Sequence, residues 1–179
     1  MMKRAYSMNS VTHHTDSYSR EVRRATLAHT PLNRATVDVL LSCSRDVDLL
    51  TRKSLYSVFH TKLDSPRFLT LVQREKVIKD GLGDREGAVR AAASKLIMKW
   101  FDFALAEAPN EQVGTWLGDD GGIMRALIRF LELFDVIGSE QIALDALNAI
   151  FVIKPDYLDA FTFTGKKFRL IDCCHVHSA

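Results

Sequence analysis

The chain has 179 residues, of which 47% are hydrophobic and 26% are charged, an ordinary composition for a folded protein. No apolar run is long enough to span a membrane, and residues 1–14 lack the apolar core of a secretory signal. The only cysteines are Cys43, Cys173 and Cys174, so a disulfide framework is not expected and a reducing compartment is favoured.

The charges are distributed unevenly along the chain. Residues 1–100 contain 18 Lys and Arg against 10 Asp and Glu, whereas residues 101–163 contain 3 against 11. The basic half predicts an anionic partner, although an uneven solvated surface explains the same counts.

Local signals predict a series of helices. The first covers residues 19–29, with Ser17 or Ser19 as its N-cap. Thr30-Pro31 predicts the start of a second helix that reaches about Cys43, because proline suits the first helical position. Asp46 is expected to cap a third helix, over residues 47–60.

Similar signals follow in the next part of the chain. Ser65-Pro66 repeats the start signal, and Thr70 with Gln73 predicts a capping box for a helix that ends at Gly81 or Gly83. Asp84 is expected to cap a helix over residues 85–103. That helix has the clearest apolar stripe, which predicts a buried face made of Val89, Ala92, Ala93, Leu96, Ile97, Trp100 and Phe101. After a glycine-rich loop over residues 109–122, two more stripes predict helices near residues 123–134 and 143–151.

Three short segments resemble one another and predict a repeat. Each has an Arg just after acidic or hydroxyl residues, and these are Arg23, Arg52 and Arg90. Repeats of this size, with a helix at each copy, are typical of α-solenoids. No segment alternates polar and apolar residues, so we expect an all-α fold, an α-solenoid of about four to five helix pairs.

The ends of the chain differ from the repeat. We expect residues 1–15 to be irregular, residues 16–163 to form the solenoid, and residues 164–179 to form an irregular tail. Neither end has the polar features of a capping repeat, so the solenoid is expected to be truncated at both ends and to expose apolar surface there.

Several segments carry a resemblance to a known family. They are Arg20 to Ala25, Arg45 to Asp48, Gln73 to Lys76, Gly81 to Arg85, Ala88 to Ala92 and Phe130 to Val136. Over residues 16–160 the chain resembles the CAP-G family of HEAT-repeat subunits of condensin, specifically an internal part of the family's N-terminal half. The segment from Gln73 to Arg85 is far more specific than a general HEAT motif.

The resemblance implies HEAT-type helix pairs and a non-catalytic role. It implies a kleisin subunit and other condensin subunits as partners, sequence-independent binding of double-stranded DNA, and a part in mitotic chromosome condensation. The implied location is the nucleus and condensed chromosomes, with the cytoplasm as an alternative in interphase. No cofactor, membrane or small-molecule substrate is implied. A peptide-binding HEAT scaffold is the main alternative, and a HEAT-like DNA-repair enzyme is a weaker one.

The repeated charges suggest two roles. A ladder of structural ion pairs between neighbouring repeats is expected from Arg23, Arg52 and Arg90 with Asp46 and Asp84. Cations outside the ladder are better suited to contact DNA phosphates, and these candidates are Arg20, Arg24, Lys53 and Arg85. Whether Arg20, Arg24 and Lys53 form one patch with Lys62 is left open.

Other chemistry receives little support. Cys173, Cys174, His175 and His177 crowd into one tail, whereas structural zinc sites draw paired ligands from separate places, so no metal site is predicted. There is no glycine-rich phosphate loop and no nucleophile motif, so we expect no catalytic site.

Overall fold

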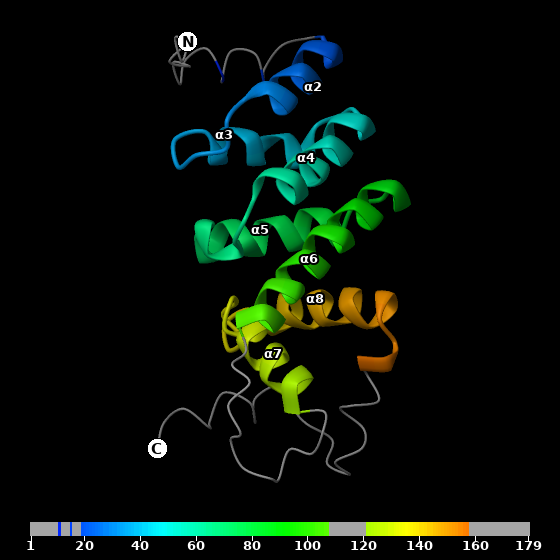
Figure 1. The fold of residues 1–179 in the computed structure, drawn as a ribbon. Coiled ribbons are helices and arrows are strands. Elements are labelled where there is room, and N and C mark those ends of the chain that lie inside the picture. The colour runs from blue at the N-terminus through cyan, green and yellow to red at the C-terminus, as the bar shows by residue number, and fades with distance from the viewer. Residues whose placement is uncertain (1–10, 12–14, 16–18, 108–120, 158–179) are drawn as a thin grey trace. The chain divides into compact units, whose positions relative to one another are not determined.

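The computed structural model describes residues 11, 15, 19–107 and 121–157. Every regular element in these ranges is helical (Figure 1). The α-helices are α2 (Arg20–His29), α3 (Val37–Ser42), α4 (Leu49–Lys62), α5 (Leu71–Leu82), α6 (Gly87–Glu107), α7 (Gly121–Leu131) and α8 (Glu140–Ile153). Two 3-10 helices are η1 (Cys43–Arg45) and η2 (Pro66–Phe68). The described residues contain no strand, which confirms the predicted all-α fold. Helices follow one another as pairs, α3 with α4, α5 with α6 and α7 with α8, as in an α-solenoid.

Parts of the expected domain organisation lie outside the described residues. These are residues 158–179, which include the Cys173 to His177 tail, residues 108–120 of the glycine-rich loop, and most of residues 1–18. None of the helices in the described ranges combines the length and apolarity that a membrane span requires.

Several predicted helix starts are confirmed. The Ser19 hydroxyl accepts a hydrogen bond from the Val22 amide and caps α2. The predicted capping box opens α5, because the Thr70 amide donates to Gln73 Oε1 at 2.9 Å and the Gln73 amide donates to the Thr70 hydroxyl at 3.3 Å. Ser65 also acts as an N-cap, although the element that it begins is the short helix η2.

Other predicted starts are wrong. Thr30-Pro31 does not open a helix, because Asn33 and Thr36 hold the following residues in turns and α3 begins only at Val37. Asp46 does not cap α4, whose N-cap is Asp48.

Asp84 is likewise not a helix cap, since α6 begins at Gly87. Both α4 and α6 therefore begin three residues after the predicted aspartate, which keeps the two helices in the same register of the repeat. Each of these aspartates forms an ion pair instead.

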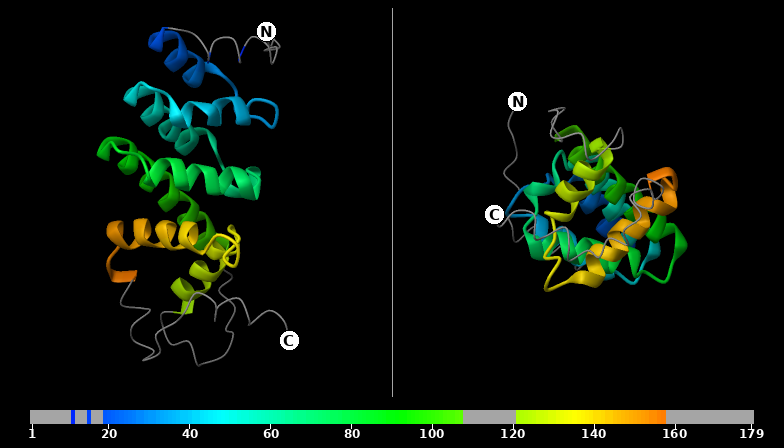
Figure 2. Two further views of the ribbon diagram at one scale, coloured as in Figure 1. Left: turned by 180° about the vertical axis from the view of Figure 1, so that it is seen from behind. Right: turned by 90° about the horizontal axis from the view of Figure 1, so that it is seen from below.

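The chain divides into two compact units. The first consists of residues 1–64 and 79–96, and the second of residues 65–78 and 97–179, so α5 and α6 each contribute to both. In the first unit α2 lies beside α4 in the views from the front and from behind (Figures 1 and 2). Its core contains the fully buried side chains of Leu27, Leu40, Leu55, Tyr56, Phe59 and Leu96.

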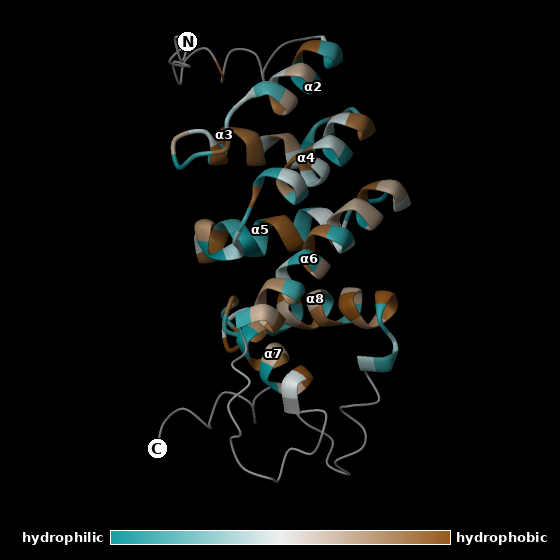
Figure 3. Ribbon diagram, viewed as in Figure 1, coloured by the Kyte–Doolittle hydropathy of each residue, from teal (hydrophilic) through white to brown (hydrophobic). Residues whose placement is uncertain are grey.

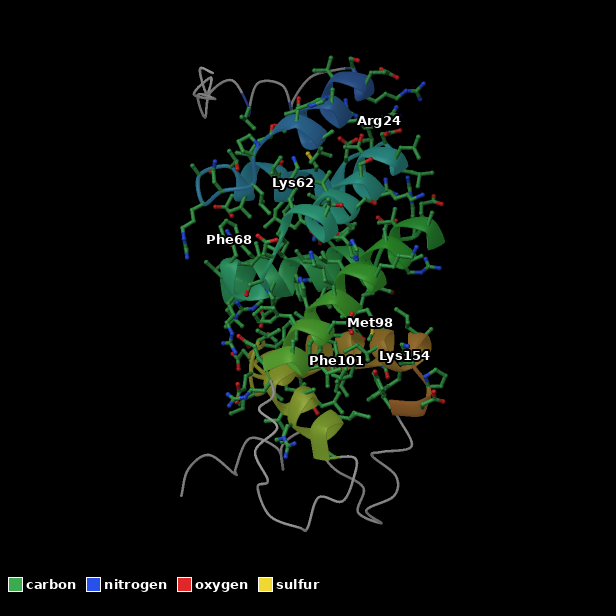
Figure 4. The ribbon with its side chains drawn as sticks, in the orientation of Figure 1. Arg24, Lys62, Phe68, Met98, Phe101 and Lys154 are labelled. Carbon is green, nitrogen blue, oxygen red and sulfur yellow. The ribbon has the colours of Figure 1, made fainter. Side chains whose placement is uncertain are left out.

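The second unit has an aromatic core. The Phe130 ring packs edge-on against Phe101 and Phe134, with centroids 5.9 and 5.3 Å away, and Phe101 is labelled in Figure 4. Trp100 is 1% exposed, as its place in the predicted stripe requires. Figure 3 shows a run of hydrophobic residues along α8, whose buried residues include Ala146 and Ile150.

Gly81 allows three helices of the first unit to pack closely. A Cβ atom at this position would lie 2.6 Å from Ala93 Cβ of α6 and 2.8 Å from Cε1 of Tyr56 of α4. Both neighbours are fully buried, so neither side chain has space into which it can move. The glycine is therefore required by contact between helices rather than by the end of α5.

We expect Gly81→Ala to lower the free energy of unfolding by about 1–3 kcal/mol, since one added methyl group overpacks the core. Gly87→Ala is the matched control, because a Cβ there meets only Arg90 Nη2 at 3.6 Å, an ordinary contact. Urea denaturation of both variants measures the difference. Equal stability of the two variants would show that the helices can separate at Gly81 without cost.

Candidate nucleic-acid interface

Two buried Arg–Asp pairs join neighbouring repeats in the first unit. Arg23 donates from Nε and Nη2 to the two carboxylate oxygens of Asp46, at 2.6 and 2.8 Å. Arg52 donates to Asp84 in the same way, at 2.6 and 3.1 Å. The four side chains are at most 10% exposed. These are the pairings that the ladder hypothesis expects.

Backbone carbonyls connect the two pairs into one continuous ladder. Arg52 Nη1 donates to the Asp46 carbonyl at 2.8 Å, so Arg52 contacts both the loop before its own helix and Asp84 of the next repeat. The amide two residues after each aspartate donates back to its carboxylate, from Asp48 at 2.7 Å and from Glu86 at 2.8 Å. Each aspartate thus accepts hydrogen bonds from a guanidinium and from its own loop, which explains why it does not act as a helix cap.

Arg90 has only part of its expected role. Its Nη1 donates to the carbonyls of Asp84 and Arg85, at 2.8 and 2.9 Å, as Arg52 does one repeat earlier. Within the described residues no carboxylate pairs with it, and its side chain is exposed. The ladder therefore runs from Arg23 to Arg90, and in the described part of the chain the Arg90 guanidinium donates to backbone carbonyls and pairs with no carboxylate.

The carboxylate of Asp84 is held in its charged form. Burial by itself raises its pKa, but the hydrogen bonds from Arg52 and from the Glu86 amide, with the charge of Arg52, outweigh burial. The pKa of Asp84 consequently lies below its ordinary value.

Two of the four phosphate candidates are engaged in ion pairs. Arg20 Nε lies 2.9 Å from Glu21, and this hydrogen bond, with those from the Glu21 amide and Ser19, lowers the pKa of Glu21 to about 2. Arg24 lies 3.4 Å from Asp48 and 3.6 Å from Glu21. Arg24 therefore has acidic neighbours in the structure, although it lies outside the ladder.

The other two candidates are freer. Lys53 follows Arg52 on α4, is exposed, and makes no ion pair within the described residues. The Arg85 side chain is 77% exposed, and its carboxylate neighbour is Glu86 at 3.7 Å. At this distance and exposure an ion pair contributes little, and both cations can be approached from solvent.

Lys62 has a different role. Its ammonium donates to the carbonyls of Ala28 and Thr30, at 2.7 and 2.8 Å, and so closes the C-terminal end of α2 (Figure 4). Burial lowers the pKa of Lys62. Lys62 lies at the opposite end of α4 from Lys53 and does not extend a patch around that residue.

The structure contains a second cluster of charges, which could not be predicted from the sequence. The Ser44 hydroxyl donates to Asp80 at 2.6 Å, and Arg45 donates to the same carboxylate at 3.0 and 3.2 Å. An open groove of about 530 Å³ lies over this contact, lined by the loop residues 44–47, by Arg52 and by residues 79–80 and 83–85. No local pattern could indicate it, because its two sides are about 35 residues apart in the chain.

In the described residues no group of His, Cys, Asp and Glu is arranged to hold a metal ion.

The ladder can be tested through its middle rung. We expect Arg52→Met to lower the free energy of unfolding by about 3–5 kcal/mol, because it leaves Asp84 buried without its cation. Arg90→Met is the matched control and should cost less than about 1.5 kcal/mol, since only exposed bonds to carbonyls are lost. Chemical denaturation gives both values, and equal losses would contradict a ladder centred on the buried pair.

The same pair predicts how stability depends on pH. The pKa of Asp84 in the folded protein lies below the value near 3.9 that it has in an unfolded chain. The stability that the charged carboxylate contributes is therefore complete above the unfolded pKa and is lost as the pH falls through the folded pKa. We expect the stability difference between the parent and Asp84→Asn to be constant from about pH 7 to 5 and to shrink below about pH 4. Urea midpoints across this range measure it, and a difference independent of pH would show that Asp84 gains nothing from its charge.

Comparison with known proteins gives a consistent result. No family model matches the chain. It is 30% identical to the protein named condensin complex subunit 3 of Schizosaccharomyces pombe over 146 residues, which are 81% of this chain and 14% of that protein. The human protein of the same name is 31% identical over 136 residues, which are 75% of this chain and 11% of that protein. The Saccharomyces cerevisiae protein of this name is 29% identical over 147 residues, which are 81% of this chain and 12% of that protein. The chain thus spans between 11% and 14% of the curated relatives that it matches.

A solved structure has the same fold. The crystal structure of the S. pombe condensin Cnd3-Cnd2 subcomplex contains a chain that matches with a TM-score of 0.69 and 24% sequence identity. The match covers 89% of this chain and 20% of the other.

Proposed function

The chain belongs to the condensin complex subunit 3 family, and from this premise we propose that it is a non-catalytic HEAT-repeat segment of a condensin subunit that contributes to DNA binding. In this proposal it binds double-stranded DNA without sequence preference, acts with a kleisin partner and other condensin subunits, and takes part in mitotic chromosome condensation. Its place is then on condensed chromosomes and in the nucleus. The S. pombe Cnd3-Cnd2 subcomplex supports a partner protein, since a chain of that subcomplex has the same fold as this one.

The observation that carries the DNA proposal is the division of the cations of the first unit into two groups. Arg23 and Arg52 are buried and neutralised by aspartates. Lys53 follows Arg52 in the chain but is exposed and makes no ion pair within the described part. Arg85 likewise comes directly after a residue of the ladder, Asp84, and its side chain projects into solvent. The ladder therefore fixes the backbone at positions from which exposed cations project, as contact with phosphates without base readout requires.

Arg20 and Arg24 are weaker contacts in this proposal. Both cations are already close to Glu21 or Asp48, so binding a phosphate would require these pairs to be exchanged or shared. We place Lys53 and Arg85 first among the DNA contacts.

The alternatives are less well supported. Trp100, a possible base-stacking residue of a repair enzyme, is buried in the core of the second unit. A peptide scaffold finds some support in the exposed apolar residues at the start of α5, where Val72 is 73% exposed. The basic composition of residues 1–100 favours an anionic partner over such an apolar one.

We expect the full chain to bind a duplex of random sequence, with affinity that falls steeply as salt rises. Lys53→Glu should weaken binding and reduce the magnitude of the log–log salt slope by about 0.9 or more, because at least one phosphate contact is lost. Fluorescence anisotropy with a labelled 20-base-pair duplex measures both quantities.

Lys154→Glu provides the matched control, since Lys154 is also exposed but lies in the acidic part of the chain (Figure 4). Its affinity should equal that of the parent. If Lys53→Glu binds as tightly as the parent at low salt, the surface beside the ladder is not the DNA site, and if the parent binds no duplex, the proposed function is wrong for this chain.

A further inference from the structure

The groove above Asp80 has no assigned role, and its charges are arranged by depth. Asp80, at its floor, is 5% exposed; it accepts a hydrogen bond from the Ser44 hydroxyl and is neutralised by Arg45. Asp46 and Asp84, also in its lining, are each 6% exposed and are neutralised by Arg23 and Arg52. The carboxylates of the groove are therefore buried and paired.

The cations of the groove are at its rim. The Arg45 side chain is 69% exposed although it bonds to Asp80, and the Arg85 side chain is 77% exposed. Lys79 is exposed as well, and it makes no ion pair within the described residues. Among the residues that line the groove, these three cations are exposed and the carboxylates are buried, so the opening of the groove attracts anions.

The lining favours phosphate over an acidic peptide. Apart from Val47, the described residues that line the groove are charged, Ser or Gly, so Val47 is the one apolar side chain in this lining that could hold an anchoring group. Peptide and protein partners draw most of their affinity from apolar or aromatic anchors in such pockets. Phosphates require only cations that can approach them closely.

We propose that this groove binds phosphates of the DNA backbone, with Lys79 as its main contact and Arg45 and Arg85 beside it. The proposal rests on the proposed function and adds Lys79, which that function does not assign. Lys79 is the most informative member, because Arg45 also holds Asp80 whereas changing the side chain of Lys79 breaks no hydrogen bond or ion pair within the described residues.

The test compares Lys79→Gln with Lys95→Gln in the full chain, since Lys95 is an exposed lysine of α6 in the same unit but outside the groove. The probes are a labelled 20-base-pair duplex and a labelled poly-glutamate peptide. Lys79→Gln should weaken duplex binding about eightfold at 0.1 M salt and reduce the magnitude of the salt slope by about 0.9, the effect of one phosphate contact. Lys95→Gln should match the parent.

A second measurement records the contact itself. Limited acetylation of lysines, read by mass spectrometry with and without the duplex, should show Lys79 protected by DNA and Lys95 unprotected. A role of Lys79 in stability alone would not produce this protection.

Three other outcomes would overturn the groove proposal, and they can be distinguished from one another. If Lys53→Glu weakens duplex binding but Lys79→Gln does not, the groove is not a phosphate site and the proposed function stands. If the parent binds poly-glutamate but not the duplex, and Lys79→Gln reduces that binding, the groove takes acidic peptides instead. If the parent binds neither probe, both proposals fail.

Discussion

The buried pair of Arg52 and Asp84 is the interaction on which the first unit depends. Removing two charges from water costs several kcal/mol for each ion, and this cost is offset only when every polar atom is well placed. Here Arg52 contacts Asp84 through two nitrogens and the Asp46 carbonyl through a third, while Asp84 also accepts its own loop amide. A pair this fully bonded fixes two loops at once, and therefore also fixes where α4 and α6 begin.

The ladder also determines which charges stay available. A side chain one residue along a helix points about 100° away, so directing Arg52 inward directs Lys53 outward. The loop residue Arg85 follows Asp84 and is likewise turned to solvent. A buried, structural charge and an exposed charge thus occupy adjacent positions in the sequence. A count of net charge alone would not tell the two kinds apart.

Much of the fold could be predicted from the sequence because its signals are local. The stripe that contains Leu96 and the capping box at Thr70 depend on residues within a few positions of each other, and the structure has both. The register of the repeat could also be predicted, since an Arg six residues after an Asp recurs at Asp46 and Asp84. The roles of those aspartates could not, because the same residue type suits a helix cap and an ion pair, and only the approach of a distant Arg decides between them. The contacts of Arg24 with Asp48 and of Arg45 with Asp80 were missed for the same reason.

The discontinuous make-up of the first unit has a consequence for the chain as it is synthesised. This unit takes residues 1–64 and then residues 79–96, so the stretch between them leaves the ribosome before the unit is complete. Arg52 therefore emerges 32 positions ahead of the carboxylate that neutralises it. Domains generally fold as units during translation, so the first unit can reach its final packing only after α6 has been made as far as Leu96. During that interval the Arg52 guanidinium lacks its carboxylate partner, and the ion pairs available to the loop before α4 are those of Asp46 with Arg23 and of Asp48 with Arg24.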